Sequence, residues 1–169
     1  MTLTFQPRTL SSRPMRRGVD DAVGLPFQLA SATIDIAIVC SDFPAAAEFY
    51  QRKLGLPVHA DLEIPERLAV PSGLAPHGFR HLRLRAGNTL IKLMEIQPAP
   101  LCAPSGFQAG VRWLTFQVAD LDSTIRHLSS RGVQFMSGRL EGLAGAFVCA
   151  QAPDNVLIEF VELYQRPQT

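Results

Sequence analysis

Apolar and polar residues alternate along two stretches of the chain that share one pattern. The stretches are residues 35–42 and 113–120, and each ends in an aspartate. Alternation of period two is typical of a strand, and aspartate is a preferred N-cap for a helix. An apolar stripe of helical period follows each aspartate and ends at Gly55 in one case and at Gly132 in the other. The sequence therefore predicts a strand–helix unit that occurs twice.

Three further strands are predicted after each helix, so both units have the order βαβββ. In the first unit these strands are expected at 56–62, 79–86 and 89–96. The last two should form a hairpin, because Gly87-Asn88 between them is a strong two-residue turn signal. In the second unit the helix is expected at 121–130 and the strands at 133–137, 146–150 and 156–163.

The chain is expected to divide into five segments. Before the first strand, arginines alternate with Ser, Pro and Thr without a sustained apolar period, which predicts a flexible extension. Between the two units, a stretch with three prolines predicts a linker. The segments are the extension (1–30), the first βαβββ module (31–96), the linker (97–110), the second βαβββ module (111–164) and a polar tail (165–169).

Composition narrows the class of protein. Hydrophobic residues make up 47% of the 169 residues, which is enough for a buried core, and the formal net charge is +1. So small a charge gives no field to attract nucleic acid or an anionic membrane, and no apolar run approaches the about 18 residues of a spanning helix. Three cysteines without close spacing argue against a disulfide framework or a zinc knuckle. We expect a cytoplasmic protein whose partner is a small molecule, with no nucleic acid and no membrane.

The order and spacing of these elements resemble the vicinal oxygen chelate superfamily, which includes glyoxalase I, bleomycin-binding proteins and extradiol dioxygenases. The resemblance covers residues 34 to 163 and rests on Asp42-Phe43-Pro44, Phe49-Tyr50, Leu54-Gly55-Leu56 and, after the turn 152–155, Ile158-Glu159-Phe160. It implies an α+β fold in which two βαβββ modules form a cup-shaped curved sheet. It also implies a homodimer as one arrangement, with the modules paired within a chain or exchanged between two chains.

The resemblance also places four metal-ligand positions, which relatives usually fill with His, Glu or Gln, His and Glu. In this chain the four residues are Asp35, Lys92, Trp113 and Glu159. Lys92 carries a positive charge and Trp113 has no acceptor atom, whereas zinc, iron and nickel need three or four N, O or S ligands. We therefore expect no metal and no other cofactor. The alternative is a divalent metal with relocated ligands, namely Asp35, Glu159 and one of His59, His77 and His127.

Alternation also predicts which residues face the cup. A two-residue turn at 87–88 places Lys92 opposite Arg83 and Met94 opposite His81, so these four share one face. We expect Lys92 to form a buried ion pair with Asp35, in place of the metal. The predicted catalytic residues are Asp35, Lys92, Glu159 and His81. The predicted substrate-binding residues are Arg83, Trp113, Met94, Thr115 and Gln117.

These residues favour a metal-independent lyase or isomerase that acts on a small oxygenated or carboxylated metabolite. Arg83 and Lys92 would bind an anionic group and stabilise an enolate or oxyanion, while Asp35, Glu159 or His81 would move a proton. One alternative is a non-catalytic protein that binds an antibiotic or another drug, as bleomycin resistance proteins do. Another is a glyoxalase- or dioxygenase-like metalloenzyme with relocated ligands. The charged cup favours the enzyme.

Overall fold

The structure is a computed structural model that describes residues 33–102 and 110–164. The predicted extension (1–30) and tail (165–169) lie outside these residues, as does half of the predicted linker. No helix in the described ranges is both long enough and apolar enough to cross a membrane.

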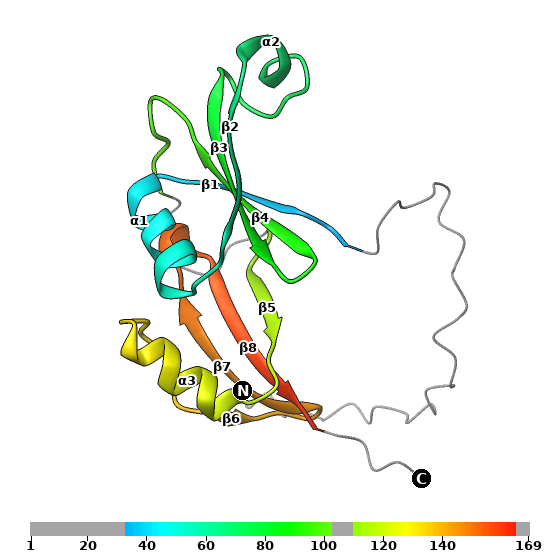
Figure 1. Cartoon of the computed structure of the whole chain (residues 1–169), viewed down its shortest axis with the longest axis vertical. Coiled ribbons are helices and arrows are strands. Elements are labelled where there is room, and N and C mark those ends of the chain that lie inside the picture. Colours follow the sequence, from blue (N-terminus) through cyan, green and yellow to red (C-terminus); the bar gives the residue numbers. More distant parts are fainter. Residues whose placement is uncertain (1–32, 103–109, 165–169) are drawn as a thin grey trace, which may run out of the picture. The chain divides into compact units, whose positions relative to one another are not determined.

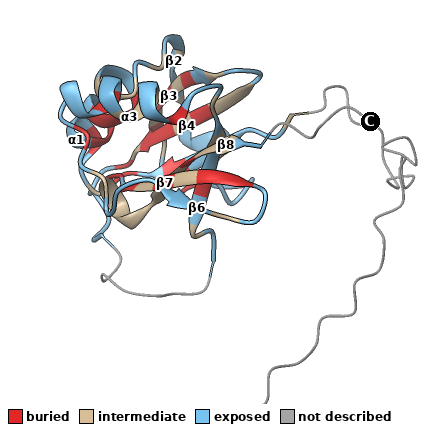
Figure 2. Cartoon of the chain, turned by 90° about the horizontal axis from the view of Figure 1, so that it is seen from below, coloured by how far each residue is buried: buried red, intermediate tan, exposed pale blue. Residues whose placement is uncertain are grey.

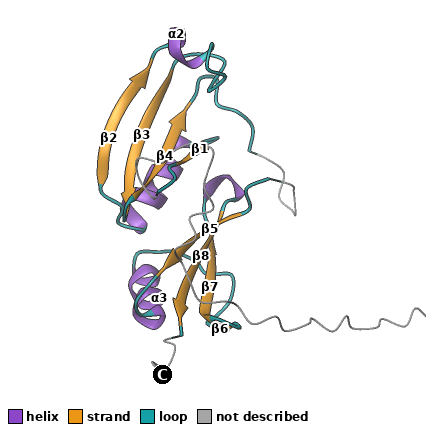
Figure 3. Cartoon of the chain, turned by 90° about the vertical axis from the view of Figure 1, so that its right-hand side faces the viewer, coloured by secondary structure: helices purple, strands orange, loops and turns teal. Residues whose placement is uncertain are grey.

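The first module forms a four-stranded mixed sheet with the strand order β1-β4-β3-β2 (Figure 1). Its strands are β1 (Ile36–Val39), β2 (Val58–Ile64), β3 (Phe79–Ala86) and β4 (Thr89–Glu95). β1 pairs with β4 in parallel, and the other two pairs are antiparallel. Helix α1 (Phe43–Ala47) continues into a π-helical turn, η1 (Glu48–Lys53). A short helix, α2 (Glu66–Ala69), lies beyond the ends of β2 and β3 (Figure 3).

The second module repeats this order, with the strands arranged β5-β8-β7-β6. Its elements are β5 (Trp113–Gln117), α3 (Leu121–Ser130), β6 (Leu140–Glu141), β7 (Gly145–Gln151), the 3-10 turn η2 (Pro153–Asn155) and β8 (Leu157–Leu163). β5 pairs with β8 in parallel, as β1 does with β4. The predicted α+β fold of two βαβββ modules is confirmed.

The strand predicted at 133–137 is wrong. Only one isolated bridge, Phe135 to Ala150, forms there, and the fourth strand of the sheet is β6. The N–H of Val133 still bonds to the helix carbonyl of Leu128, and Val133 is buried in the core. The chain therefore leaves α3 toward the core and passes β7 too briefly to build a ladder.

The predicted helix boundaries follow from local chemistry. Asp42 accepts a hydrogen bond from the N–H of Ala45 at 2.9 Å, and Asp120 accepts one from Ser123 at 2.7 Å. These bonds satisfy donors that a helix N-terminus otherwise leaves free. At the other ends, Gly55 and Gly132 have φ angles of 75° and 78°, which favour glycine.

One hydrophobic core includes the helix-facing sides of both sheets (Figure 2). The first sheet contributes Leu82, Leu84, Ile91 and Leu93, and the second sheet and the helices contribute the rest. Its most buried members are Tyr50, Leu84, Ile91, Leu93, Leu121, Val148 and Ile158. Each large apolar side chain buried in this way stabilises the fold by about 1.5–3 kcal/mol. The apolar faces are therefore used for folding, and the opposite faces remain for a site.

A polar contact also joins the two modules. Asp154 in η2 accepts hydrogen bonds from the backbone N–H of Ser41, at 3.0 Å, and from its hydroxyl. Asp154 and Asn155 have φ angles of 61° and 58°, a conformation that Asp and Asn tolerate better than most residues. The turn before β8 is therefore fixed against the loop that begins α1.

Gly145→Ala is expected to destabilise the protein by about 1–3 kcal/mol. A Cβ at this position would collide with the backbone carbonyl oxygen of Glu162 on the paired strand β8. Urea unfolding followed by circular dichroism measures the effect. Gly138→Ala is the matched control, because a Cβ at Gly138 meets nothing within 4 Å. Equal stability of the two variants would contradict the close strand packing at Gly145.

Candidate functional site

Five of the predicted residues lie together on the face of the first sheet opposite its apolar face. They are Asp35, His81, Arg83, Lys92 and Met94. The register pairs Lys92 with Arg83 and Met94 with His81, as the two-residue turn predicted. β1 lies beside β4 and brings Asp35 to the same face. The structure therefore assembles one charged surface from β1, β3 and β4.

Lys92 and Asp35 form the expected ion pair, with 2.8 Å between Nζ and Oδ2. Asp35 also accepts a hydrogen bond from the N–H of Leu90 at 3.1 Å. The bond to Lys92, followed by that to Leu90, lowers the pKa of Asp35 below its ordinary value. The expectation of a buried pair is wrong, since the side chains are 23% and 34% exposed for Lys92 and Asp35. β1 is an edge strand, so water reaches the carboxylate from the open side.

Arg83 lies beside Lys92 and has no such partner. Its Nε is buried, and no acceptor for it exists among residues 33–102 and 110–164. On this face the neighbours across the sheet are small: Ala60 pairs with Arg83, and Ala37 pairs with Lys92. The two cations therefore lie side by side between two alanines. Sequence reasoning missed the alanines, although the strand register would have identified them.

His81 is the buried polar residue of this surface, with 8% of its area exposed. Neither ring nitrogen has a hydrogen-bond partner within the described part of the chain. Burial lowers its pKa, and the positive charges of Arg83 and Lys92 lower it further. Its ring contacts the edge of Phe79, with 5.8 Å between centroids. His81 is therefore a neutral imidazole at neutral pH, and its two ring nitrogens are buried without partners in the described chain.

A small apolar cluster borders His81 at the α2 end of the sheet. Its members are Ala69, Ala75, Phe79, Met94 and Ile96. Ala69 belongs to α2 and Ala75 to the loop that follows, so this segment covers the end of the strands. Of the predicted substrate-binding residues, Met94 is part of this cluster and is 5% exposed.

The remaining predicted residues lie on the second sheet. Thr115 donates a hydrogen bond to Glu159 at 2.7 Å, and Trp113 is 55% exposed. Gln117 lies two residues further along β5, on the same face. No hydrogen bond or ion pair joins these residues to the Lys92 surface in the described ranges. The predicted site therefore consists of two groups on two sheets.

The four positions that the family resemblance assigns to a metal do not fit one. The ammonium group of Lys92 is bonded to the carboxylate of Asp35, and indole has no lone pair in the ring plane to offer a cation. No group of three or more His, Cys, Asp or Glu close enough to hold a metal occurs in the described sequence. His59, one candidate for a relocated ligand, is instead within 2.7 Å of the guanidinium of Arg85.

The hollows of the single chain lie away from the Lys92 surface. One of about 470 Å³ lies between Leu54, Leu56 and the flank of α3, over Phe116 and Phe160. Another of about 600 Å³ lies at the ends of β5 and β8 and includes Gln117. Neither of these hollows includes Lys92 or Trp113, and Gln117 is the one member of the two predicted groups that lines either of them.

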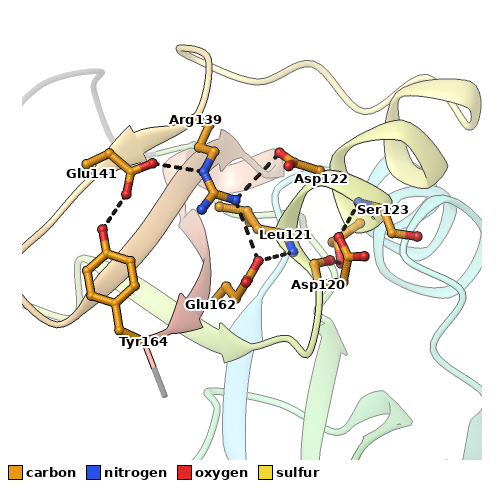
Figure 4. Close-up of polar contacts among 9 residues, drawn as sticks. Asp120, Leu121, Asp122, Ser123, Arg139, Glu141, Glu162 and Tyr164 are labelled. Atoms are coloured by element: carbon orange, nitrogen blue, oxygen red, sulfur yellow. Dashed lines mark hydrogen bonds and ion pairs between the residues drawn. The ribbon is translucent and has the colours of Figure 1, made fainter. Parts of the chain in front are cut away.

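A polar network borders the second hollow and was not predicted (Figure 4). Arg139 lies 3.0 Å from Glu141 and 3.6 Å from both Asp122 and Glu162. Glu162 also accepts the N–H of Leu121 at 2.7 Å. These contacts fix the start of α3 to β6 and β8, which is a structural role, and no sequence motif marks them.

The family follows from a comparison of sequences. Residues 33–160 match the profile of the Glyoxalase/Bleomycin resistance protein/Dioxygenase superfamily. The chain belongs to this superfamily. An uncharacterised Bacillus subtilis protein, YwkD, is 29% identical over 128 residues, which cover 75% of this chain and 93% of that protein.

Two solved structures have a similar fold. A glyoxalase family protein from Bacillus cereus has a TM-score of 0.63 and 17% identity, over 83% of this chain and 98% of the other. TnmS3, an antibiotic binding protein from Streptomyces sp. CB03234, has a TM-score of 0.58 and 21% identity, over 81% and 100% of the two chains. At these identities the likeness concerns the fold alone.

The protonation of His81 gives a test of the site's electrostatics. We expect His81 to titrate below about 6.5, the ordinary value for histidine, and Lys92→Met to raise its pKa because one nearby positive charge is removed. NMR titration of the imidazole proton resonances measures both. Arg85→Met is the control, since Arg85 does not contribute to the shift of His81. A His81 pKa that ignored Lys92→Met would contradict the placement of these two residues.

The same shift predicts how stability depends on pH. Because the pKa of His81 is lower in the folded state, the unfolded chain takes up a proton first as the pH falls below about 6.5. The folded protein is then expected to lose stability, until the pH has fallen through the folded-state pKa. Urea unfolding at several pH values should show a smaller loss for His81→Gln in this window. If the free energy of unfolding of the wild type and of His81→Gln changed with pH in the same way, His81 would not be the group responsible for the loss of stability.

Proposed function

We propose that the protein binds a small oxygenated or carboxylated anion on the surface of Lys92, Arg83 and His81 and acts on it as a metal-independent lyase or isomerase. The observation that supports this proposal is Arg83, which forms no ion pair within the described residues and lies between Ala60 and the ion-paired Lys92, next to the neutral His81 along β3. A charged group that is half buried and unpaired costs stability, so its retention favours a role in binding.

The donors present match a carboxylate. A guanidinium presents its N–H groups as a planar fork that suits two carboxylate oxygens, and the buried Nε of Arg83 lacks an acceptor. Lys92 has three donors, of which Asp35 accepts one. Ala37 and Ala60 leave space above both cations. An anion here would accept from both side chains without breaking the ion pair.

Proton transfer next to the bound anion is the chemistry that suits these groups. Arg83 and Lys92 would stabilise the negative charge that develops on an enolate. Asp35 is a weak base because its pKa is lowered. His81 is neutral, and its ring nitrogens have no partner in the described chain. It lies on β3 two residues before Arg83, on the same face of the sheet. We assign the proton transfer to His81.

A second candidate function is binding without catalysis. Trp113 is 55% exposed and offers a flat surface on which a planar drug can stack. TnmS3, which has the same fold, is described as an antibiotic binding protein. Turnover distinguishes the candidates, because a binding protein returns its ligand unchanged.

We also propose that the site is completed in a homodimer. Lys92 and Arg83 of one copy would face Trp113 and Glu159 of the partner subunit, so that two open sheet faces enclose one ligand. The charges are complementary: within the described residues, Arg83 of the first sheet forms no ion pair, and Glu159 is bonded to the neutral Thr115. This arrangement corresponds to the exchanged pairing of modules.

Anion binding is expected to require Arg83. The chain has one tryptophan, so its fluorescence reports on Trp113 during titration with 2-oxo and 2-hydroxy carboxylates. Arg83→Met should weaken binding at least about tenfold, since hydrogen bonds to charged groups contribute about 1.5–3 kcal/mol. Arg85→Met, on the same strand, should bind within about twofold of the wild type. Equal losses for both variants would indicate a general charge effect and not a site.

Catalysis is tested with the carboxylates that bind. In D2O, NMR should show exchange of the proton next to the carbonyl or carboxyl group, and exhaustive chelation should not stop it. His81→Gln should abolish exchange while binding persists. Loss of exchange on chelation and recovery with added metal would disprove the metal-independent mechanism. Tight binding without exchange would favour the binding protein.

The dimer is tested by subunit mixing. Arg83→Met and Glu159→Gln variants, co-expressed with different tags, should each be impaired in binding. If each site uses both chains, half of a random mixture is heterodimer, and about one quarter of all sites then carry no substitution. Binding capacity should recover to about that fraction. No recovery in isolated heterodimers would show that modules of one chain form the site.

A further inference from the structure

The face that carries Lys92 and Arg83 changes from charged to apolar along the strands. The next row of the same face, on the side of Lys92 and Arg83 toward α2, consists of Val39, Met94, His81 and Leu62. After that come Ile64 and Phe79, which pair with each other and belong to the small apolar cluster. The polarity therefore falls from the two cations toward α2.

Two apolar side chains of the second row are open to a ligand. Val39 is 43% exposed and Leu62 is 40% exposed, at the two edges of the sheet. Met94 and His81, between them, are 5% and 8% exposed, so a ligand reaches this row at its edges and not at its centre. Leu62 lies on β2, the strand beside Arg83, and an apolar group packed against it would remove it from water, which is favourable.

The opposite direction along the strands does not offer such a surface. The pair that precedes Lys92 and Arg83 is Leu90 with Arg85, and Arg85 is bonded to His59. Asp35 lies at the same end, where it accepts the N–H of Leu90. An apolar group placed there would cover charged groups that need water, so the apolar part of a ligand must extend toward α2.

From this gradient we infer that the ligand is an amphipathic monocarboxylate, with its carboxylate on Arg83 and Lys92 and an aliphatic body that runs along β2 from Ala60 to Leu62. The inference rests on the proposed anion site and names its ligand class. Same-face residues of a strand are about 7 Å apart, so a body of about five carbons reaches the apolar row.

The test is calorimetric titration of the full chain with acetate, butanoate, hexanoate and octanoate. Affinity should rise about two- to fourfold with each added methylene up to about six carbons and then level off. Leu62→Ser should flatten this dependence and leave acetate binding unchanged. Leu143→Ser is the matched control, because Leu143 is fully exposed in the turn between β6 and β7 and should not alter the series.

A dicarboxylate of equal length separates this inference from the alternative that the ligand carries two anionic groups. Adipate has the six carbons of hexanoate but places a second charge on the apolar row, and it should bind more weakly than hexanoate. Tighter binding of adipate would overturn the inference and assign a second anion contact, at Arg85. Affinity that depends on Arg83 but not on chain length would also overturn it, while the proposed function would stand. If no carboxylate binds, the proposed function fails as well.

Discussion

Alternation along β3 and β4 separates two kinds of chemistry onto the two faces of the first sheet. Leu82, Leu84, Ile91 and Leu93 are almost fully buried under the helices, so their burial fixes the register. A slip by one residue would expose these side chains and bury Arg83 and Lys92, at a cost of several kcal/mol for each charge. The core therefore positions the charged surface, and the site depends on hydrophobic packing that it does not itself contain.

Lys92 determines what the charged surface can do. At a position where relatives hold a metal ligand, it supplies a fixed positive charge through a 2.8 Å contact with Asp35. An ammonium group and a metal ion both stabilise a developing negative charge, but the ammonium group needs no ligand set beyond its carboxylate partner. Under the proposed function, Lys92 therefore takes the electrophilic role, and the reaction needs no metal.

The sequence predicted the fold and the register, and the reason is local. Asp42 and Asp120 cap their helices through bonds three residues away, and Gly87-Asn88 sets the hairpin pairing without help from distant residues. Predictions that depended on tertiary placement were less accurate. The burial of His81 depends on the α2 segment, and the exposure of Asp35 depends on β1 being an edge strand. The network of Arg139 joins three separate elements and has no local signal.

The exposure of the Asp35–Lys92 pair also bears on why the pair is present. A surface ion pair contributes little to stability, about 0–1 kcal/mol at most sites, so folding alone gives weak reason to keep it. Arg83 and His81 next to it leave buried nitrogen atoms without partners in the described chain, which lowers stability further. Under the proposed function, a bound anion would offset part of this cost by accepting hydrogen bonds from the guanidinium of Arg83.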